Sequence, residues 1–164
     1  MPFLRSFRTA LAASPVLLAL VAAQPAFATI EGGIKAIQAN DMTGAEKELQ
    51  PLAKERDPRA QFLLGLYVYG NPNSKMFDLD KGAPLLLDCS ERGYVPAMLP
   101  LAGAYADGKG VPKSFYNAFK WLLIADRWNA PNVGTLIEQT AKELKPEEIE
   151  KAKTEALAFT FKTK

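Results

Sequence analysis

Hydrophobic residues recur along this sequence at the three- and four-residue spacing of amphipathic helices. Two neighbouring stretches show the spacing: Ala97, Leu101, Ala104 and Tyr105, and then Phe115, Ala118, Phe119, Leu122 and Ala125. Residues spaced in this way fall on one face of a helix. No segment alternates with the period of two that is typical of a strand. The pattern therefore predicts an all-α protein.

The sequence also repeats itself with a period of about 37 residues. The segment 60–65 returns as 97–102, and each copy is followed by a tyrosine-containing stretch and a glycine. The second halves of the two units match as well, 80–93 with 116–129. A period of this size predicts one helix pair in each unit, and such a pair cannot bury its apolar face without stacking on its neighbours.

Small and large residues occupy different packing positions in such a repeat. Small residues recur where two helices must approach closely, larger ones fill the space between the helices, and glycines end helices because they adopt positive φ. The positions assigned to packing and turns are Ala60, Leu64, Gly65, Gly93, Ala97, Leu101, Tyr105, Gly108, Gly110, Ala118, Trp121 and Ala125.

Two further helix pairs are expected to flank the repeats. They cover residues 30–56 and 132–160 and cap the repeat units 57–93 and 94–129. Proline in the first helical turn marks helix starts after Asp57 and after Lys145. Residues 29–164 are thus expected to form a single domain of about four stacked antiparallel helix pairs, an α-solenoid.

The first 28 residues have the pattern of a secretory signal peptide. Arg5 and Arg8 precede an apolar stretch from 10 to 23, and the small-residue triplet 26–28 places the cleavage point between Ala28 and Thr29. The apolar stretch is too short for a transmembrane span. The expected product is therefore periplasmic or secreted and has no stable membrane insertion after cleavage.

The second unit carries a family resemblance. It reads Ala97-x-x-x-Leu101-Ala102-x-x-Tyr105-x-x-Gly108-x-Gly110-Val111-Pro112, followed by Ala118-x-x-Trp121-x-x-x-Ala125. This resembles the Sel1-like repeat, a relative of the tetratricopeptide repeat; the first unit resembles it less closely. The resemblance implies a right-handed α-solenoid that binds a protein or peptide partner. It does not identify the partner, because the repeated residues are those that pack helices together.

Composition removes most catalytic chemistry. The chain has no histidine and one cysteine, Cys89, which excludes histidine-based triads, histidine or cysteine-only zinc sites and cysteine redox pairs. No glycine-rich phosphate loop occurs, and residues 29–164 carry no net charge, which gives no support to nucleic-acid binding. We expect no catalytic residue, metal or cofactor. Cys89 is interpreted as a buried apolar residue, with an intermolecular disulfide as the alternative.

A β-lactam-related activity also needs consideration. Some cysteine-rich exported members of the Sel1-like family are linked to binding or slow hydrolysis of penicillin-type compounds. This chain has neither their paired cysteines nor the Ser-x-x-Lys and Lys-Thr-Gly motifs of serine β-lactamases. The carboxylates between 143 and 150 alternate with lysines and are interpreted as a solvated helix face.

Four residues are candidates for contact with a partner. Tyr67 and Tyr69 cannot both face inward at a spacing of two on one helix, so one of them should face solvent. The irregular loop 71–77 carries Met76 and Phe77, which either anchor a partner or pack back onto the core. The binding candidates are therefore Tyr67, Tyr69, Met76 and Phe77.

Three functional hypotheses follow. The first is an adaptor, scaffold or regulator in the cell envelope that binds a protein or peptide and has no catalytic activity. The second is an inhibitor or immunity-type protein that neutralises a toxin or host factor. The third is a weak binder, or a hydrolase, of β-lactams or cell-wall fragments.

Overall fold

The computed structural model describes residues 28–163, so all of the expected signal peptide (1–28) except its last residue lies outside the described residues. The regular structure in the described range is helical: α1 (Ile30–Gln38), α2 (Met42–Lys54), α3 (Pro58–Leu63) with a π-helical turn η1 (Leu64–Val68), α4 (Leu79–Glu91), a 3₁₀ turn η2 (Val95–Ala97) leading into α5 (Met98–Asp107), α6 (Phe115–Arg127), α7 (Gly134–Ala141) and α8 (Pro146–Ala158).

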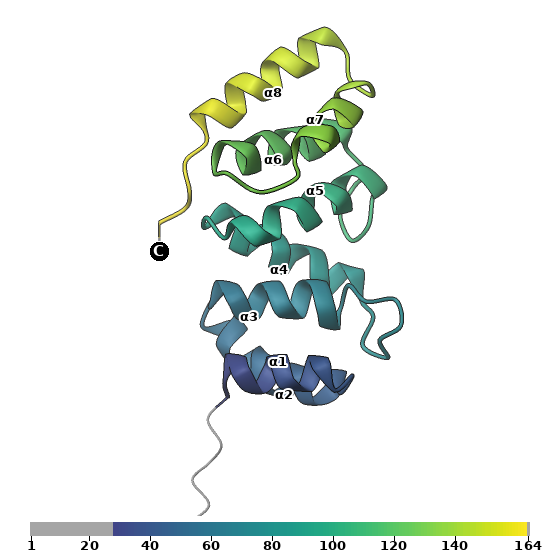
Figure 1. Ribbon diagram of the computed structural model, residues 1–164, viewed down its shortest axis with the longest axis vertical. Coiled ribbons are helices and arrows are strands. Elements are labelled where there is room, and N and C mark those ends of the chain that lie inside the picture. The colour runs from purple at the N-terminus through teal and green to yellow at the C-terminus, as the bar shows by residue number, and fades with distance from the viewer. Residues whose placement is uncertain (1–27, 164) are drawn as a thin grey trace, which may run out of the picture.

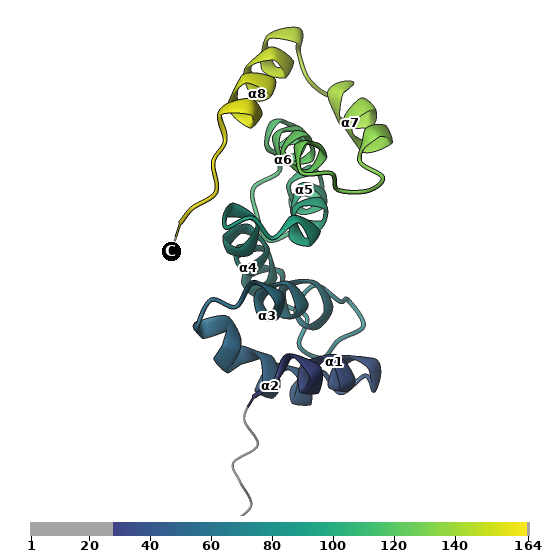
Figure 2. The same cartoon turned by 60° about the vertical axis from the view of Figure 1, so that its left-hand side comes forward.

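The helices stack in sequence order to form an elongated solenoid (Figure 1). Each of the helices α1 to α6 packs against the next one along the chain. In the view of Figure 2, α1, α5 and α7 lie on one side of the stack and α2, α4 and α8 on the other. The expected all-α solenoid is therefore confirmed.

The fourth helix pair differs from the others. Both α7 and α8 pack on α6, and in Figure 2 they diverge on either side of it. The eight residues of α7 include no buried side chain. The last helix, α8, therefore joins the stack through α6 and not through α7.

Two helices begin where prolines in the sequence place them. Asp57 precedes α3, and its carboxylate accepts the backbone N–H groups of Arg59 and Ala60 at 2.8 and 3.2 Å. Pro58 follows in the first turn, where its missing N–H costs nothing. At α8 the Glu148 carboxylate accepts the N–H of Lys145 at 2.9 Å. Both proline-marked starts are thus confirmed.

A left-handed residue ends the second helix of each of the first three pairs. Arg56, Gly93 and Asn129 have φ angles of 65°, 91° and 57°, and they recur at nearly the repeat period. After each of them, the N–H of the next residue donates to a carbonyl five positions earlier, as Tyr94 does to Cys89 at 3.0 Å. This is the hydrogen bond of a Schellman cap. The turns between units therefore share one geometry, although only one of them uses glycine.

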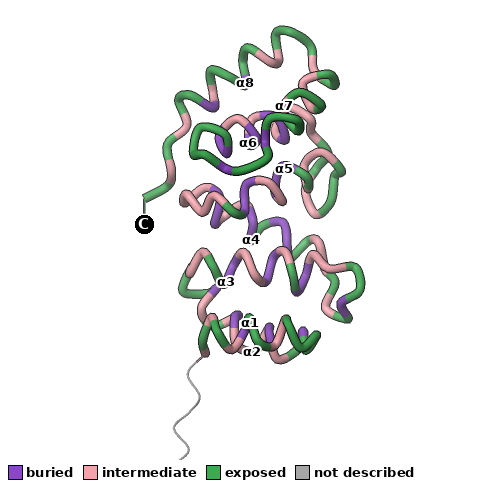
Figure 3. The backbone as a smooth tube through the Cα atoms, in the orientation of Figure 1, coloured by how far each residue is buried: buried purple, intermediate pink, exposed green. Residues whose placement is uncertain are grey.

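The core consists of two clusters of buried side chains, which Figure 3 traces as buried segments along the stack. One cluster lies between α2 and the α3–η1 helix and the other extends from α4 to α8. The assigned packing positions are buried: Ala60, Leu64, Gly65, Ala97, Leu101, Ala118, Trp121 and Ala125; Tyr105 is half-buried.

The first unit depends on a close contact between two glycines. A Cβ added to Gly65 would lie 2.9 Å from the Gly82 carbonyl oxygen, and one added to Gly82 would lie 2.8 Å from the Gly65 carbonyl oxygen. Side chains larger than hydrogen cannot fit between these two backbones. In the second unit the equivalent residues, Ala102 and Ala118, are buried alanines.

This contact generates a stability prediction. Gly82→Ala should lower the free energy of unfolding by about 1–3 kcal/mol, because the methyl group would push η1 away from α4. Urea unfolding followed by circular dichroism measures the change. Gly103→Ala is the matched control: it also lies inside a helix, but nothing lies within 4 Å of an added Cβ. It should raise stability by up to about 1 kcal/mol. Equal effects of the two substitutions would contradict the packing argument.

Candidate functional site

An aromatic and aliphatic surface lies where the first repeat unit meets the second. Tyr67 is 43% exposed and contacts the Phe62 ring edge-on, with centroids 6.0 Å apart. Phe62 in turn contacts the Tyr94 ring at 5.4 Å. We call this surface the junction patch; it consists of Phe62, Leu66, Tyr67, Tyr94 and Leu99.

The repeat explains how the patch is assembled. Phe62 and Leu66 are one helical turn apart, and Leu99 occupies in α5 the position that Phe62 occupies in α3. Phe62, Leu66, Tyr94 and Leu99 pack partly buried against the larger core cluster. Their inner edges therefore belong to the core, and their outer edges remain available to a partner.

The patch carries no charge of its own. Burial raises the pKa of Tyr94, so its hydroxyl group stays protonated and neutral at physiological pH. The charged groups that act on Tyr94 are Arg59 and Asp57, which pair with each other at 3.3 Å. A partner would therefore meet an apolar surface with hydroxyl groups and, near Tyr94, two opposite charges that compensate each other.

Of the two candidate tyrosines, Tyr67 faces solvent and Tyr69 does not. Tyr69 is 3% exposed, and its hydroxyl donates to the Glu46 carboxylate of α2. The cause is η1, in which the Tyr69 N–H donates to the Leu64 carbonyl at 2.9 Å, five residues back. In an α-helix two residues five apart are about 140° apart around the axis. The wider turn moves Tyr69 over Leu64 and so into the core, which removes Tyr69 from the candidate binding surface.

Of the two candidate residues in the irregular loop 71–77, only Phe77 is exposed to solvent. Ser74 is buried, and its hydroxyl accepts the Met76 N–H at 3.0 Å. Met76 packs against the smaller core cluster, whereas the Phe77 side chain remains about half exposed. Within residues 28–163 no aromatic ring contact joins Phe77 to the junction patch.

The structure also describes the groups considered for chemistry. Burial raises the pKa of the Cys89 thiol to about 12, which keeps it protonated. In residues 28–163 no group of three or more possible ligand side chains is placed to hold a metal ion. None of the helices described there is long and apolar enough to cross a membrane.

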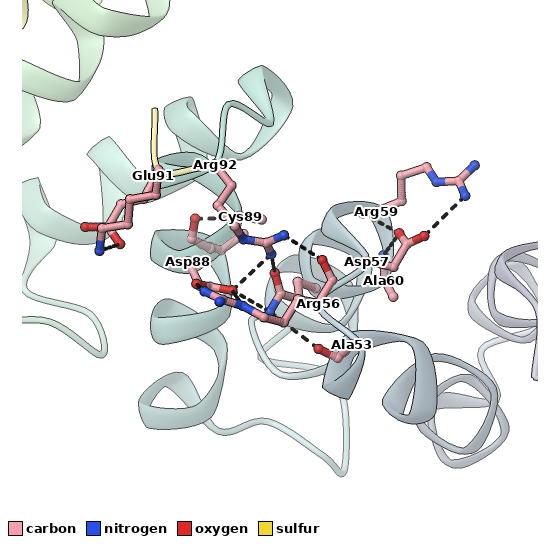
Figure 4. Close-up of polar contacts among 12 residues, drawn as sticks. Ala53, Arg56, Asp57, Arg59, Ala60, Asp88, Cys89, Glu91 and Arg92 are labelled. Atoms are coloured by element: carbon pink, nitrogen blue, oxygen red, sulfur yellow. Dashed lines mark hydrogen bonds and ion pairs between the residues drawn. The ribbon is translucent and has the colours of Figure 1, made fainter. Parts of the chain in front are cut away.

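Sequence reasoning missed a polar network between the first helix pair and the first repeat unit (Figure 4). The Arg92 side chain is only 7% exposed and donates to the Arg56 carbonyl, the Gln61 side chain and the Asp88 carboxylate. Arg56 pairs with the same carboxylate at 2.5 Å. The network joins the turn before α3 to the end of α4, and it serves the fold.

The charges around Asp88 determine its titration. Partial burial acts to raise its pKa, but hydrogen bonds from Arg56 and Gln61 and the charge of Arg92 outweigh burial and lower it to about 2. A carboxyl group with a lowered pKa contributes stability above its ordinary pKa of 3.8, and that contribution disappears as the pH falls towards 2.

Asp88→Asn should therefore destabilise the protein in a pH-dependent manner. At neutral pH we expect a loss of about 1.5–3 kcal/mol, because the buried Arg92 loses its charged acceptor. The difference from the wild type should shrink between pH 3.8 and about 2. Urea unfolding over this range measures both. Glu150→Gln, which removes an exposed ion pair to Lys153, is the control and should change little. A difference that is independent of pH would refute the role of the Asp88 charge.

Comparisons with known proteins bear on the fold. No protein-family model matches the chain, and no curated protein matches it. The structure is similar to the crystal structure of a protective antigen present in uropathogenic Escherichia coli strains, which displays a Sel1-like repeat fold. The TM-score is 0.69 at 21% identity, over 77% of this chain and 28% of that one. This chain thus spans about 28% of the length of the antigen.

The fold therefore belongs to a defined class. The stacked helix pairs and the likeness to the antigen show that the chain has the Sel1-like repeat fold, as its second unit suggests.

Proposed function

We propose that this chain is a helical-repeat protein of the bacterial cell envelope that binds a protein partner through its junction patch and has no catalytic activity of its own. The observation that carries the proposal is the exposed tyrosine edge of the patch, at Tyr67. A tyrosine offers a large apolar area with a hydrogen-bonding tip at little cost in side-chain entropy, which is why tyrosines are frequent anchors at interfaces.

The surroundings of the patch favour a peptide or the edge of a domain as the partner. Phe62 and Tyr94 hold each other in a tilted contact, so the rings are already ordered before binding. Gly103, one turn beyond Leu99, has open space around its Cβ position. A partner backbone can therefore approach α5 closely beside the aromatic rings.

Two alternative functions, an inhibitor and a small-molecule binder, can be tested on the same molecule. An inhibitor or immunity-type protein could use the same patch, and it would be recognised by a single tight complex with a toxin or host factor. A small-molecule binder of the β-lactam or cell-wall type would need a cavity. A groove of about 250 Å³ between α6 and α8, lined by Leu123, Asp126, Arg127, Lys153, Ala156 and Leu157, is the place to test for one.

Affinity capture tests the patch. The mature protein from Thr29 serves as bait for a periplasmic extract of the native host. Tyr67→Ala combined with Leu99→Ala should weaken binding of the captured partner at least about tenfold, because both substitutions remove anchor surface. Leu157→Ala, on the 73% exposed side chain of α8, is the control for loss of an exposed apolar group elsewhere.

Each outcome of the capture is informative. Loss with the patch variant alone supports the proposal. Equal capture by all three proteins would contradict the patch and direct attention to Phe77. If no partner is captured, the proposal fails, and peptidoglycan fragments and β-lactams should be screened against the α6–α8 groove.

Export is proposed from the sequence pattern of residues 1–28, and the start of α1 is compatible with it. The Thr29 hydroxyl accepts the Gly32 N–H at 2.9 Å, and the Thr29 N–H donates to the Glu48 carboxylate at 3.0 Å. Cleavage after Ala28 would turn this nitrogen into an ammonium group. A positive charge is unfavourable at a helix N-terminus, and Glu48 lies where it compensates that charge.

The processed end can be measured directly. Expression of residues 1–164 in a bacterial host should yield a periplasmic or secreted protein whose intact mass begins at Thr29. Ala26→Arg should block processing, because the cleavage triplet requires small residues. Recovery of the unprocessed chain from the cytoplasm in both cases would contradict export.

A further inference from the structure

The chain turns back along the solenoid after its last helix. Residues 159–163, which we call the strap, leave α8 and run beside the stack towards the earlier repeats (Figure 1). The Lys162 N–H donates to the Glu91 carbonyl at the end of α4 at 2.8 Å. The Lys162 ammonium group pairs with the Glu91 carboxylate at 2.5 Å. The strap thus reaches back 71 residues along the sequence.

Two phenylalanines of the strap pack against aromatic side chains of the solenoid. The Phe159 ring contacts the Trp121 ring at 5.4 Å, and the Phe161 ring contacts the Trp128 ring at 4.8 Å. In extended backbone, residues two apart point to the same side, so both rings face the stack. The Phe161 seat depends on Gly93, because a Cβ there would lie 3.1 Å from the Phe161 ring.

These contacts define a site with three separate requirements. We call it the strap groove; it consists of Glu91, Gly93, Trp121 and Trp128. It takes two aromatic side chains two residues apart, a backbone N–H at the Glu91 carbonyl, and a cation at the Glu91 carboxylate. These are the elements by which proteins recognise an extended peptide: a main-chain hydrogen bond for affinity, and pockets for alternate side chains for specificity.

The outer part of the strap is held weakly. Residues 160–163 are tied to the stack by one backbone hydrogen bond, one exposed ion pair and the partly buried Phe161 ring. That ring packs over Gly93 and contacts the rings of Phe159 and Trp128, and Trp128 is itself 46% exposed. Exposed ion pairs contribute little, and a segment with so few contacts opens without unfolding the rest. Arg127, by contrast, donates to the carbonyls of Ala156, Leu157 and Phe159 and so fixes the end of α8.

We propose that the strap groove is a binding site for an extended partner segment of the form aromatic-x-aromatic-basic, and that residues 159–162 are its resident intramolecular ligand. A partner segment displaces the strap and takes the same two ring seats and the same carboxylate. The strap groove has no residue in common with the junction patch, although Gly93 directly precedes Tyr94 in the chain.

Fluorescence anisotropy with a labelled peptide of residues 158–164 tests the proposal. A chain ending at Ala158 should bind the peptide at least about tenfold more tightly than the full chain, because the tethered strap competes at a high effective concentration. The peptide carrying Phe161→Ala should lose at least about tenfold in affinity. Glu91→Gln in the shortened chain should weaken binding of the wild-type peptide but not of a Lys162→Ala peptide.

A second variant tests the proposal without shortening the chain. Full-length protein with Phe161→Ala and Lys162→Ala keeps the Phe159 contact with Trp121, and it should also bind the peptide more tightly than the wild type. Circular dichroism establishes that each variant is folded.

Two results would overturn the proposal. The first is equal or absent peptide binding by the full chain and both opened variants. The second is a concentration-dependent dimer of the full chain that disappears on shortening, measured by sedimentation, because the occupant would then be the strap of a second copy.

Discussion

The helix pairs of this protein bury their apolar faces only against one another, and the rest of the structure depends on how closely they approach. In the first unit the approach is limited by two glycine backbones, Gly65 and Gly82. In the second unit alanines occupy the equivalent places. This stacking brings Phe62 and Tyr94 into contact although they are 32 positions apart, one on a first helix and one in the turn to the next unit. The junction patch is thus a product of the stack.

The turns between units provide the second organising feature. Arg56 and Gly93 occupy equivalent left-handed positions, but their neighbourhoods differ. At the first turn the exposed carbonyl of Arg56 is taken by the Arg92 guanidinium. At the second turn the missing side chain of Gly93 leaves room for the Phe161 ring. The same backbone geometry therefore supports a polar network that joins the first helix pair to the first unit and, one unit later, a groove that holds an extended segment.

The sequence predicts the periodic parts of this structure well and its local exceptions poorly. Helix pairs and packing positions can be predicted from the spacing of apolar residues, because every repeat packs its helices in the same way. Two helix starts can be predicted from proline in the first turn. The choice between Tyr67 and Tyr69 depends on the single π-helical turn, for which the sequence has no distinct signal. The Arg92 network joins residues of different units without any period. The strap does leave a signal, since Phe159 and Phe161 have the spacing of extended backbone at the end of a helical pattern.

Comparison of the two units separates residues that the fold requires from residues that it does not. Leu64 and Leu101 are both fully buried, so the stack needs an apolar side chain there. At a position three residues later the first unit has the exposed Tyr67 and the second has Ala104, so the stack has no common side chain there. The Tyr67 ring touches Phe62 at its edge, but the repeat does not require an aromatic ring at this position. A large apolar group that is held half in solvent, and that the fold can replace by a methyl group, points to a contact outside the chain.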